Sequence, residues 1–430
     1  MMKKITSESE YREELSARGR LPEGFSTGLT ELEFIPEELD TDVKMPMNLS
    51  LLLLERSTDS FAGVFTRNKF PGAPVLLCRS RLESGLFRGI IINNKIANVC
   101  TETGLGDAET VVSAAASAIG CEAEELMAAS TGVIGWRLPA GEITSAVPAL
   151  LTAAEADCSR NALGLADHIM TTDSYPKLRS RNLAGGTITA VAKGAGMIEP
   201  NMATMLCFIM TDLDVPREIL REMLPRVVAS SFNRITVDSD QSTSDMVIAA
   251  SSKRVECTDY IDFEAALSEI CQELAGDIVR NGEGTAHVIK VRVDGAESSL
   301  QAAAVGKALA NSPLVKTAIA GNDPNVGRFV SSIGDYCGNN DIDIDARRTE
   351  IRLGGELIFS GGSLVLDPAK EVRLSAYLKE CRMDPVHKGF PLHEKSVEID
   401  INIAMGESHA TILGSDLTHE YVRENADYRS

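Results

Sequence analysis

The stretch of sequence with the clearest chemical potential is KGAGMIEPNMATML, residues 193–206. Gly194 and Gly196 permit positive φ angles and a close approach to a ligand, and Pro200 stiffens the residues beyond them. Apolar neighbours draw Thr204 toward the interior, where a hydroxyl must be hydrogen-bonded or used. Neither glycine pattern of nucleotide-binding loops, GxGxxG or GxxxxGK[ST], is present. The segment predicts either a turn into a core strand or a site whose reactive group is Thr204.

Two further groups of polar residues could contribute to such a site. Ser130, Thr131 and Gly132 follow an apolar stretch that we expect to end a helix. Their hydroxyl and N–H groups are donors that can stabilise an oxyanion. Alternatively, the three residues form an ordinary turn between a helix and a strand. Glu283, between two glycines after an amphipathic helix, can pair with an ammonium group. In a surface loop it would simply be solvated.

The elements around these residues alternate between helix and strand. We expect a helix over 107–119, ended by Gly120, and a second that is capped by Asp262 and ended by Gly282. Strands are expected at 60–66, 88–93, 187–192, 289–293 and 397–403. The pattern predicts a mixed α/β fold in which two or more sheets are covered by helices.

Composition excludes several classes of partner. The 430 residues include 42 Lys and Arg against 62 Asp and Glu, a net charge of −20 that repels nucleic acid and anionic lipid. The 9 cysteines are scattered, which indicates reduced thiols and a cytoplasmic location. The 6 histidines show no metal-ligand spacing, so we expect no metal and no cofactor. We expect no membrane anchor, because the longest aliphatic run, 51–54, is far too short to span a bilayer.

Residues 193–206 closely resemble the signature of the ornithine acetyltransferase (glutamate N-acetyltransferase) family. The resemblance extends in order over further blocks of the chain: GVFTRN (63–68), ASTGVIG (129–135), TTD (171–173), SFNRITVDSDQSTSD (231–245), RNGEG (280–284), ANSPLVKTAIAGNDPNVGR (310–328) and YVRENADYRS (421–430).

The resemblance implies an enzyme that cuts itself between Ala203 and Thr204. The products would be an α chain, 1–203, and a β chain, 204–430, in a two-domain fold, and we expect an α2β2 or higher assembly. Thr204 would then be the nucleophile of a two-step transfer of acetyl from N2-acetylornithine to glutamate in arginine biosynthesis. Its freed α-amine, with a pKa of about 8, lies beside its own hydroxyl and can act as the base. Acetyl-CoA stays open as a second donor.

The resemblance also assigns the remaining site residues. Thr131 and Gly132 would form the oxyanion hole. Substrate contacts would come from Thr172, or Thr171 if the alignment shifts by one, and from Lys193, Glu283, Asn425 and Ser430. In the family, the C-terminal tail closes over the site.

The sequence departs from the family pattern in places that concern the acceptor. Asn94, Lys95 and Ile96 stand in a block that usually reads Asn-Ser-Gly-Asn-Ala-Asn, and Val326 replaces a common tryptophan. Further departures are Ser239 for glycine, Ser244 for asparagine and Asn281 for aspartate. A paralogue with another amino-acid acceptor therefore stays open. The sequence is also compatible with an amidase or aminopeptidase that uses the same threonine, and with a noncatalytic binding homologue.

Overall fold

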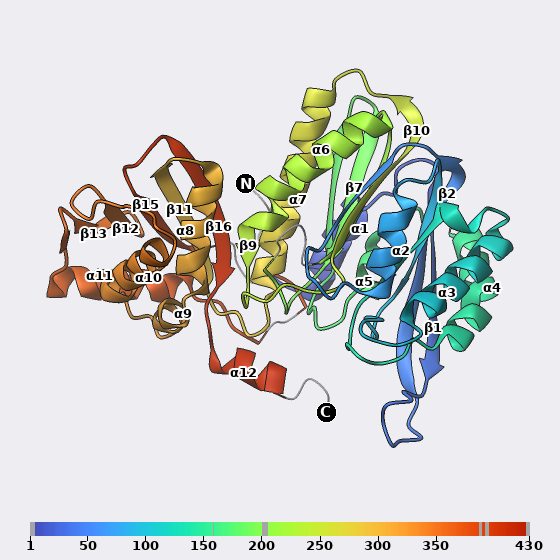
Figure 1. Cartoon of the computed structure of the whole chain (residues 1–430), viewed down its shortest axis with the longest axis horizontal. Helices are drawn as coiled ribbons and strands as arrows, with labels where there is room; N and C mark the ends of the chain where they lie inside the picture. Colours follow the sequence, from blue (N-terminus) through green and yellow to red (C-terminus); the bar gives the residue numbers. More distant parts are fainter. Residues whose placement is uncertain (1–4, 158, 200–204, 387–388, 392–394, 427–430) are drawn as a thin grey trace.

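The computed structural model describes residues 5–157, 159–199, 205–386, 389–391 and 395–426. In this part of the chain, three sheets with their helices form two lobes (Figure 1). The larger lobe holds two stacked sheets, and the smaller lobe is built on the third. The expected mixed α/β architecture is confirmed. No helix of the described chain is long and apolar enough to cross a membrane.

The first sheet of the larger lobe has the order β1-β2-β4-β5 and is buried on both faces. Its strands and the helices beside it are β1 (Phe25–Phe34), β2 (Met45–Thr58), β4 (Phe87–Asn93), β5 (Leu126–Ser130), α2 (Ala73–Arg81), α3 (Gly104–Ile119), η1 (Ala123–Glu125) and α4 (Ala140–Ala156). Ile91 packs in the cluster with α3 and α4, whereas Ile90 and Ile92 pack toward the second sheet. Burial on both faces explains the apolar run in β4.

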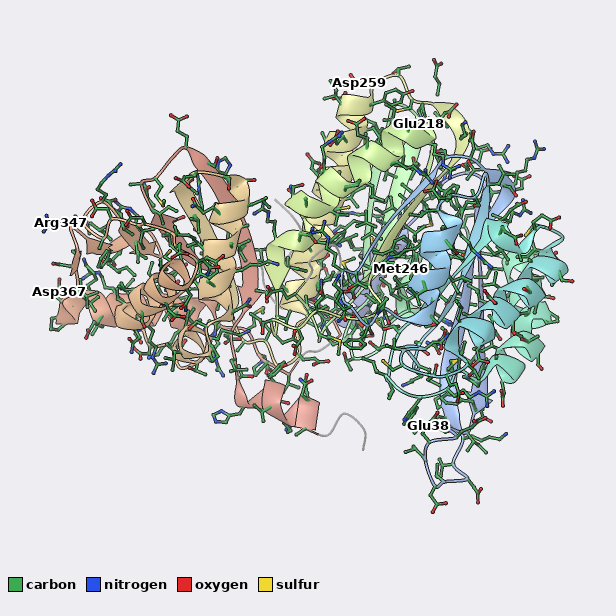
Figure 2. All side chains as sticks on the ribbon, in the orientation of Figure 1. Glu38, Glu218, Met246, Asp259, Arg347 and Asp367 are labelled. Atoms are coloured by element: carbon green, nitrogen blue, oxygen red, sulfur yellow. The ribbon has the colours of Figure 1, made fainter. Side chains whose placement is uncertain are left out.

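The second sheet has the order β3-β10-β8-β7-β6. Its strands and helices are β3 (Phe61–Phe65), β6 (Lys177–Leu183), β7 (Gly186–Lys193), β8 (Leu206–Asp214), β10 (Met246–Glu256), α6 (Arg217–Ser230), η2 (Phe232–Arg234) and α7 (Tyr260–Arg280). One face packs on the first sheet, and α6 and α7 cover the other. The lobe therefore has four layers, helix, sheet, sheet and helix. Figure 2 shows Met246 inside these layers and Glu218 and Asp259 at the periphery.

The smaller lobe contains the third sheet, in the order β14-β13-β12-β15-β11-β16-β9. Its elements are β9 (Ile235–Thr236), β11 (Val288–Ala296), β12 (Glu350–Leu353), β13 (Glu356–Ser360), β14 (Ser363–Leu364), β15 (Val397–Asn402), β16 (Ser408–Ser415), α8 (Ser299–Asn311), α9 (Pro313–Ala320), α10 (Val326–Asn339) and α11 (Pro368–Cys381). The short edge strand β9 directly follows α6 and η2 of the larger lobe and so links the two lobes. After β16, the chain continues into α12 (His419–Ala426), which lies beneath the junction of the two lobes (Figure 1).

Two further helices pack in the larger lobe. These are α1 (Glu8–Arg18) and α5 (Leu163–His168), and both contribute to the core between the first two sheets. Tyr11 of α1 donates a hydrogen bond to the Pro176 carbonyl at 2.9 Å. Its ring meets that of Tyr175 edge-on, with centroids 5.7 Å apart. The N-terminal helix thereby packs beside the residues that lead into β6.

Two local expectations are wrong. The helix α7 begins at Tyr260, because the side chain of Asp259, not of Asp262, accepts hydrogen bonds from the first N–H groups of the helix. It ends at Arg280, before Gly282. The residues preceding Thr131 form β5 instead of a helix, because they pair in parallel with β4. Alanine-rich composition favours a helix locally, and the sheet overrides it.

Candidate active site

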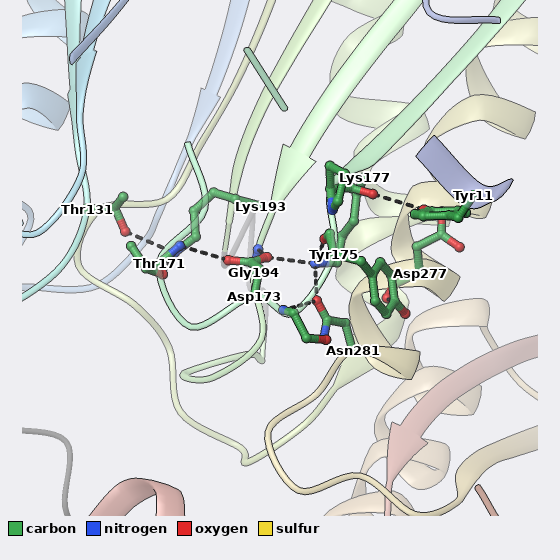
Figure 3. Close-up of polar contacts among 12 residues, drawn as sticks. Tyr11, Thr131, Thr171, Asp173, Tyr175, Lys177, Lys193, Gly194, Asp277 and Asn281 are labelled. Atoms are coloured by element: carbon green, nitrogen blue, oxygen red, sulfur yellow. Dashed lines mark hydrogen bonds and ion pairs between the residues drawn. The ribbon is translucent and has the colours of Figure 1, made fainter. Parts of the chain in front are cut away.

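Lys193 ends β7, and its half-buried ammonium lies between two hydroxyls (Figure 3). Its Nζ is 3.0 Å from Thr131 Oγ1 and 2.8 Å from Thr171 Oγ1. An ammonium group only donates, so both hydroxyl oxygens accept and the Thr131 proton can be donated elsewhere. Burial lowers the pKa of Lys193, and the negative charge of Asp173 opposes the shift. The lysine is thus held in a fixed position.

The turn after β5 presents two hydrogen-bond donors. Gly132 has φ 130°, and a Cβ there would overlap the carbonyl group of Lys95. The N–H groups on either side are used: Thr131 donates to the Asn93 carbonyl and Val133 to the Lys95 carbonyl. Among the described residues, the Gly132 N–H has no acceptor. The Thr131 hydroxyl and the Gly132 N–H are therefore donors that an oxyanion could use.

Glu283 is buried and supported by the glycine-rich segment. Its N–H donates to the Ala195 carbonyl at 3.1 Å, and its carboxylate accepts a hydrogen bond of 2.9 Å from the Asn425 side chain of α12. A Cβ on Gly196 would lie 2.3 Å from a Glu283 carboxylate oxygen. Gly194 has the expected positive φ, 154°. Gly196 does not have a positive φ. A glycine is needed there because the Glu283 carboxylate lies too close to leave room for a Cβ atom.

These residues line two adjoining cavities. The inner pocket, of about 270 Å³, is bordered by Lys193, Gly196 and Ser244 among others. The outer pocket, of about 720 Å³, extends past Trp136 toward α12. Gly132, Thr171, Thr172 and Glu283 border both. The inner pocket brings together all the predicted site residues that the structure describes: Thr131, Gly132, Thr172, Lys193, Glu283 and Asn425.

Three predicted residues, Ala203, Thr204 and Ser430, lie outside the described part of the chain. Of the two threonines proposed for substrate contact, Thr171 is the one hydrogen-bonded to Lys193, whereas Thr172 is exposed. Both stay candidates for substrate contact, since both border the inner pocket.

Sequence reasoning missed a buried polar network beside Lys193 (Figure 3). Lys177 Nζ lies 2.6 Å from Asp173 Oδ1 and 2.6 Å from Asn281 Oδ1, and over the Tyr175 ring at 5.1 Å. The same Asp173 oxygen accepts a 2.7 Å bond from the Gly194 N–H. The network therefore ties the start of the glycine-rich segment to the loop that carries Glu283.

The segment after Gly194 is fixed by a second carboxylate. Asp238 accepts hydrogen bonds from the N–H groups of Met197 and Ile198, at 2.6 and 2.7 Å. Met197 is held at φ 55°, a strained angle for a side chain other than glycine. Asp238 belongs to a block that carried the family resemblance, but no local pattern indicates that it would bind this distant loop.

The departures from the family pattern have different environments. Asn94 is buried and bonded to the Asn48 N–H and the Met170 carbonyl. Ile96 and Val326 are buried in the cores of the larger and smaller lobes. Lys95, at φ 72°, is exposed and lines the outer pocket. Of these four, Lys95 is the one that a substrate can meet.

No group of three or more His, Cys, Asp or Glu side chains in the described ranges is arranged to hold a metal ion. The described side chains of the site carry hydroxyl, amide, ammonium and carboxylate groups.

The sequence profile of the ArgJ family matches residues 37–430. The chain belongs to the ArgJ family. It is 40% identical to the arginine biosynthesis bifunctional protein ArgJ of Bartonella quintana over 397 residues, covering 88% of this chain and 90% of that protein. The corresponding protein of Rhodococcoides fascians is 36% identical, with 98% of each chain covered.

Two solved structures are similar to part of the chain. An ArgJ structure from Bacillus halodurans has 33% identity and a TM-score of 0.45, covering 51% of this chain and 97% of that one. Ornithine acetyltransferase from Mycobacterium tuberculosis, solved with ornithine, has 28% identity and a TM-score of 0.34, covering 44% and 97%.

Family membership confirms the expectation from the sequence. The protein is an enzyme, an acyltransferase of arginine biosynthesis of the bifunctional ArgJ type.

Proposed function

We propose that the inner pocket transfers acetyl from N2-acetylornithine to glutamate through an ester on Thr204. One observation supports this most strongly. The residues that the resemblance assigns to the oxyanion hole and to substrate binding come from positions between 131 and 425, yet they border a single cavity. A noncatalytic binding protein needs neither paired oxyanion donors nor the Ala-Thr motif that the resemblance assigns to self-cleavage.

The proposed reaction has two half-reactions after self-cleavage. Cutting between Ala203 and Thr204 gives chains 1–203 and 204–430, which we expect to assemble as α2β2 or higher. The Thr204 hydroxyl attacks the acetyl carbonyl of acetylornithine, ornithine leaves with the proton, and the acetyl ester remains. The amine of glutamate then attacks the ester and releases Thr204. Thr131 and Gly132 stabilise the oxyanion in both steps.

The charges of the pocket suit amino-acid substrates. Lys193, with one N–H left beyond its two hydroxyl contacts, binds the α-carboxylate that both substrates share. Glu283, oriented by Asn425, binds the side-chain ammonium of ornithine. Thr171 or Thr172 and Ser430 complete the contacts. The outer pocket leaves room for acetyl-CoA as a second acetyl donor, and we place the enzyme in the cytoplasm.

Neutralising the two charged residues should affect the substrates differently. Glu283→Gln should lower kcat/KM for acetylornithine more than for acetylglutamate, because the side chain of ornithine is cationic. Lys193→Met should lower both through the shared α-carboxylate. Each loss should be about 30-fold or more, equivalent to roughly 2 kcal/mol. The measurement is kcat/KM for panels of N-acetyl donors and free amino-acid acceptors, with exposed Glu13→Gln as the control.

The same panel distinguishes the competing functions. A parent enzyme that ignores ornithine and glutamate but transfers acetyl between other amino acids is a paralogue. Release of acetate or of an N-terminal residue, with no transfer to an amine, identifies a hydrolase. Either result contradicts the proposed substrates.

Thr131→Ala should lower turnover by about 10²-fold, the usual effect of removing one oxyanion donor. KM should also rise, because Lys193 loses one of its two hydroxyl contacts. We expect this rise to be a smaller factor than the fall in turnover. Thr131→Ser keeps the hydroxyl and should restore most of the activity. Steady-state kinetics of the three proteins test this. Equal turnover of the alanine variant and the parent would exclude the Thr131 hydroxyl from the oxyanion hole.

A further inference from the structure

Lys95 occupies a backbone position that suits glycine. Its φ is 72°, in the left-handed region that is unfavourable for residues other than glycine. Hydrogen bonds fix the backbone around it: its carbonyl accepts from the Val133 N–H at 2.8 Å, and the Ile96 N–H donates to the Asn94 carbonyl at 3.0 Å. The turn is therefore set by its neighbours, and the lysine is held there despite the strain.

The side chain of Lys95 is placed where it can meet a ligand. It is exposed and lines the outer pocket. Its carbonyl group packs directly against Gly132, while the side chain of the adjacent Thr131 contacts Lys193. Two cations therefore flank the turn that carries the candidate oxyanion donors, one from the loop after β4 and one from the end of β7.

The other charged side chains of the outer pocket are mostly acidic. Glu283, Glu420 and Glu424 line it together with Arg423. Arg423 forms an ion pair with Glu420 on its own helix, whereas Lys95 makes no ion pair with any carboxylate that the structure describes. Burial and the charges of Glu283 and Glu420 raise the pKa of Glu424. Among the described residues that line this pocket, Lys95 is therefore the cation that is available to an anionic ligand.

A site that binds ornithine and glutamate in turn must accommodate side chains of opposite charge. The two share an α-carboxylate, but one side chain is cationic and the other anionic. Glu283 suits the first and repels the second. We propose that Lys95 determines the acceptor by binding the side-chain carboxylate of glutamate, an assignment that rests on the proposed function. Lys193 then binds the α-carboxylate, and the dicarboxylate spans the Thr131–Gly132 turn.

The test compares glutamate with glutamine, which has nearly the same shape and a neutral side chain. In the parent, kcat/KM should favour glutamate. Lys95→Met should lower kcat/KM for glutamate by about 10-fold or more and leave that for glutamine within about twofold, so that the preference disappears. The kcat/KM for acetylornithine, which depends only on the first half-reaction, should stay unchanged.

Two substitutions to glycine distinguish the effect of the Lys95 charge from the effect of its backbone strain. Lys95→Gly should lose the preference for glutamate yet raise the thermal unfolding midpoint, because it relieves the left-handed strain. Cys100→Gly is the matched control: Cys100 lies on the same loop, is exposed and has φ 57°. It should raise the midpoint and keep the acceptor preference of the parent.

The possible failures are distinguishable. If the parent does not acetylate glutamate, the proposed function is contradicted and this assignment with it. If the parent acetylates glutamate and Lys95→Met keeps the full preference over glutamine, only the role of Lys95 is overturned.

Discussion

A protein in which Thr204 is replaced by alanine should remain one uncut chain with no transferase activity. In the proposed mechanism the Thr204 hydroxyl attacks the Ala203 carbonyl, the peptide nitrogen becomes the new α-amine, and water hydrolyses the resulting ester. The same residue then supplies both nucleophile and base. Removing its hydroxyl stops cleavage and transfer together, which is the largest loss of activity that we expect from a single substitution.

Intact mass under denaturing conditions measures the cleavage directly. The parent should give two fragments, split before residue 204, whose masses add up to the full chain plus one water. The alanine variant should give the full chain alone. Thr204→Ser keeps a hydroxyl and should still be cut. Cleavage of the alanine variant at the same bond would exclude Thr204 as the cleaving group.

Lys177→Met should destabilise the fold by about 3 kcal/mol or more, the largest stability effect that we expect. The ion pair of Lys177 with Asp173 is fully buried, with 0% of either side chain exposed. Removing one partner leaves an uncompensated buried charge. The control is Lys253→Met, whose partners Asp59 and Asp214 are largely exposed, and it should cost about 1 kcal/mol or less. Urea unfolding of the three proteins at neutral pH gives the comparison.

The same ion pair predicts how stability depends on pH. Burial alone would raise the pKa of Asp173, but the charges of Lys177 and Lys193 and the hydrogen bonds from Lys177 and Gly194 together outweigh it and lower the pKa from 3.8 to about 2. A lowered carboxyl pKa stabilises the fold above about pH 4 and stops doing so as the pH falls toward 2. The parent should lose about 2 kcal/mol from this group over that range. Lys177→Met should lose less, and an equal loss in both proteins would contradict the assignment to this pair.

Much of the fold could be predicted from periodicity alone. The apolar run of β4 and the alternating residues of β11 and β15 indicated strands close to those observed. These patterns can be seen in a short stretch of sequence, because the spacing of apolar residues along one helix or strand reflects which of its faces are buried. The stripe of α7 was equally clear, and its cap was misplaced because Asp259 and Asp262 are both plausible caps three residues apart.

The polar support of the site could not be predicted in this way. Lys177 and Asn281 are 104 residues apart and meet through the packing of β6 against α7. A lysine in a sequence usually indicates a solvated surface, and nothing near Lys177 shows that it is fully buried. The family resemblance supplied the residues that line the pocket. It did not supply Asp173 and Asp238 as the groups that fix the loop.

The strand order of the second sheet has a consequence for the proposed cut. In the order β3-β10-β8-β7-β6, the two strands from after residue 204, β10 and β8, lie between strands from before it, and β7 pairs directly with β8. Cutting the chain would therefore not release a separately folded unit. The two fragments would stay interleaved and copurify, and neither could complete the sheet alone. Unfolding of the cut enzyme would also separate its two fragments, so its midpoint would fall more steeply on dilution than that of the uncut Thr204→Ala chain.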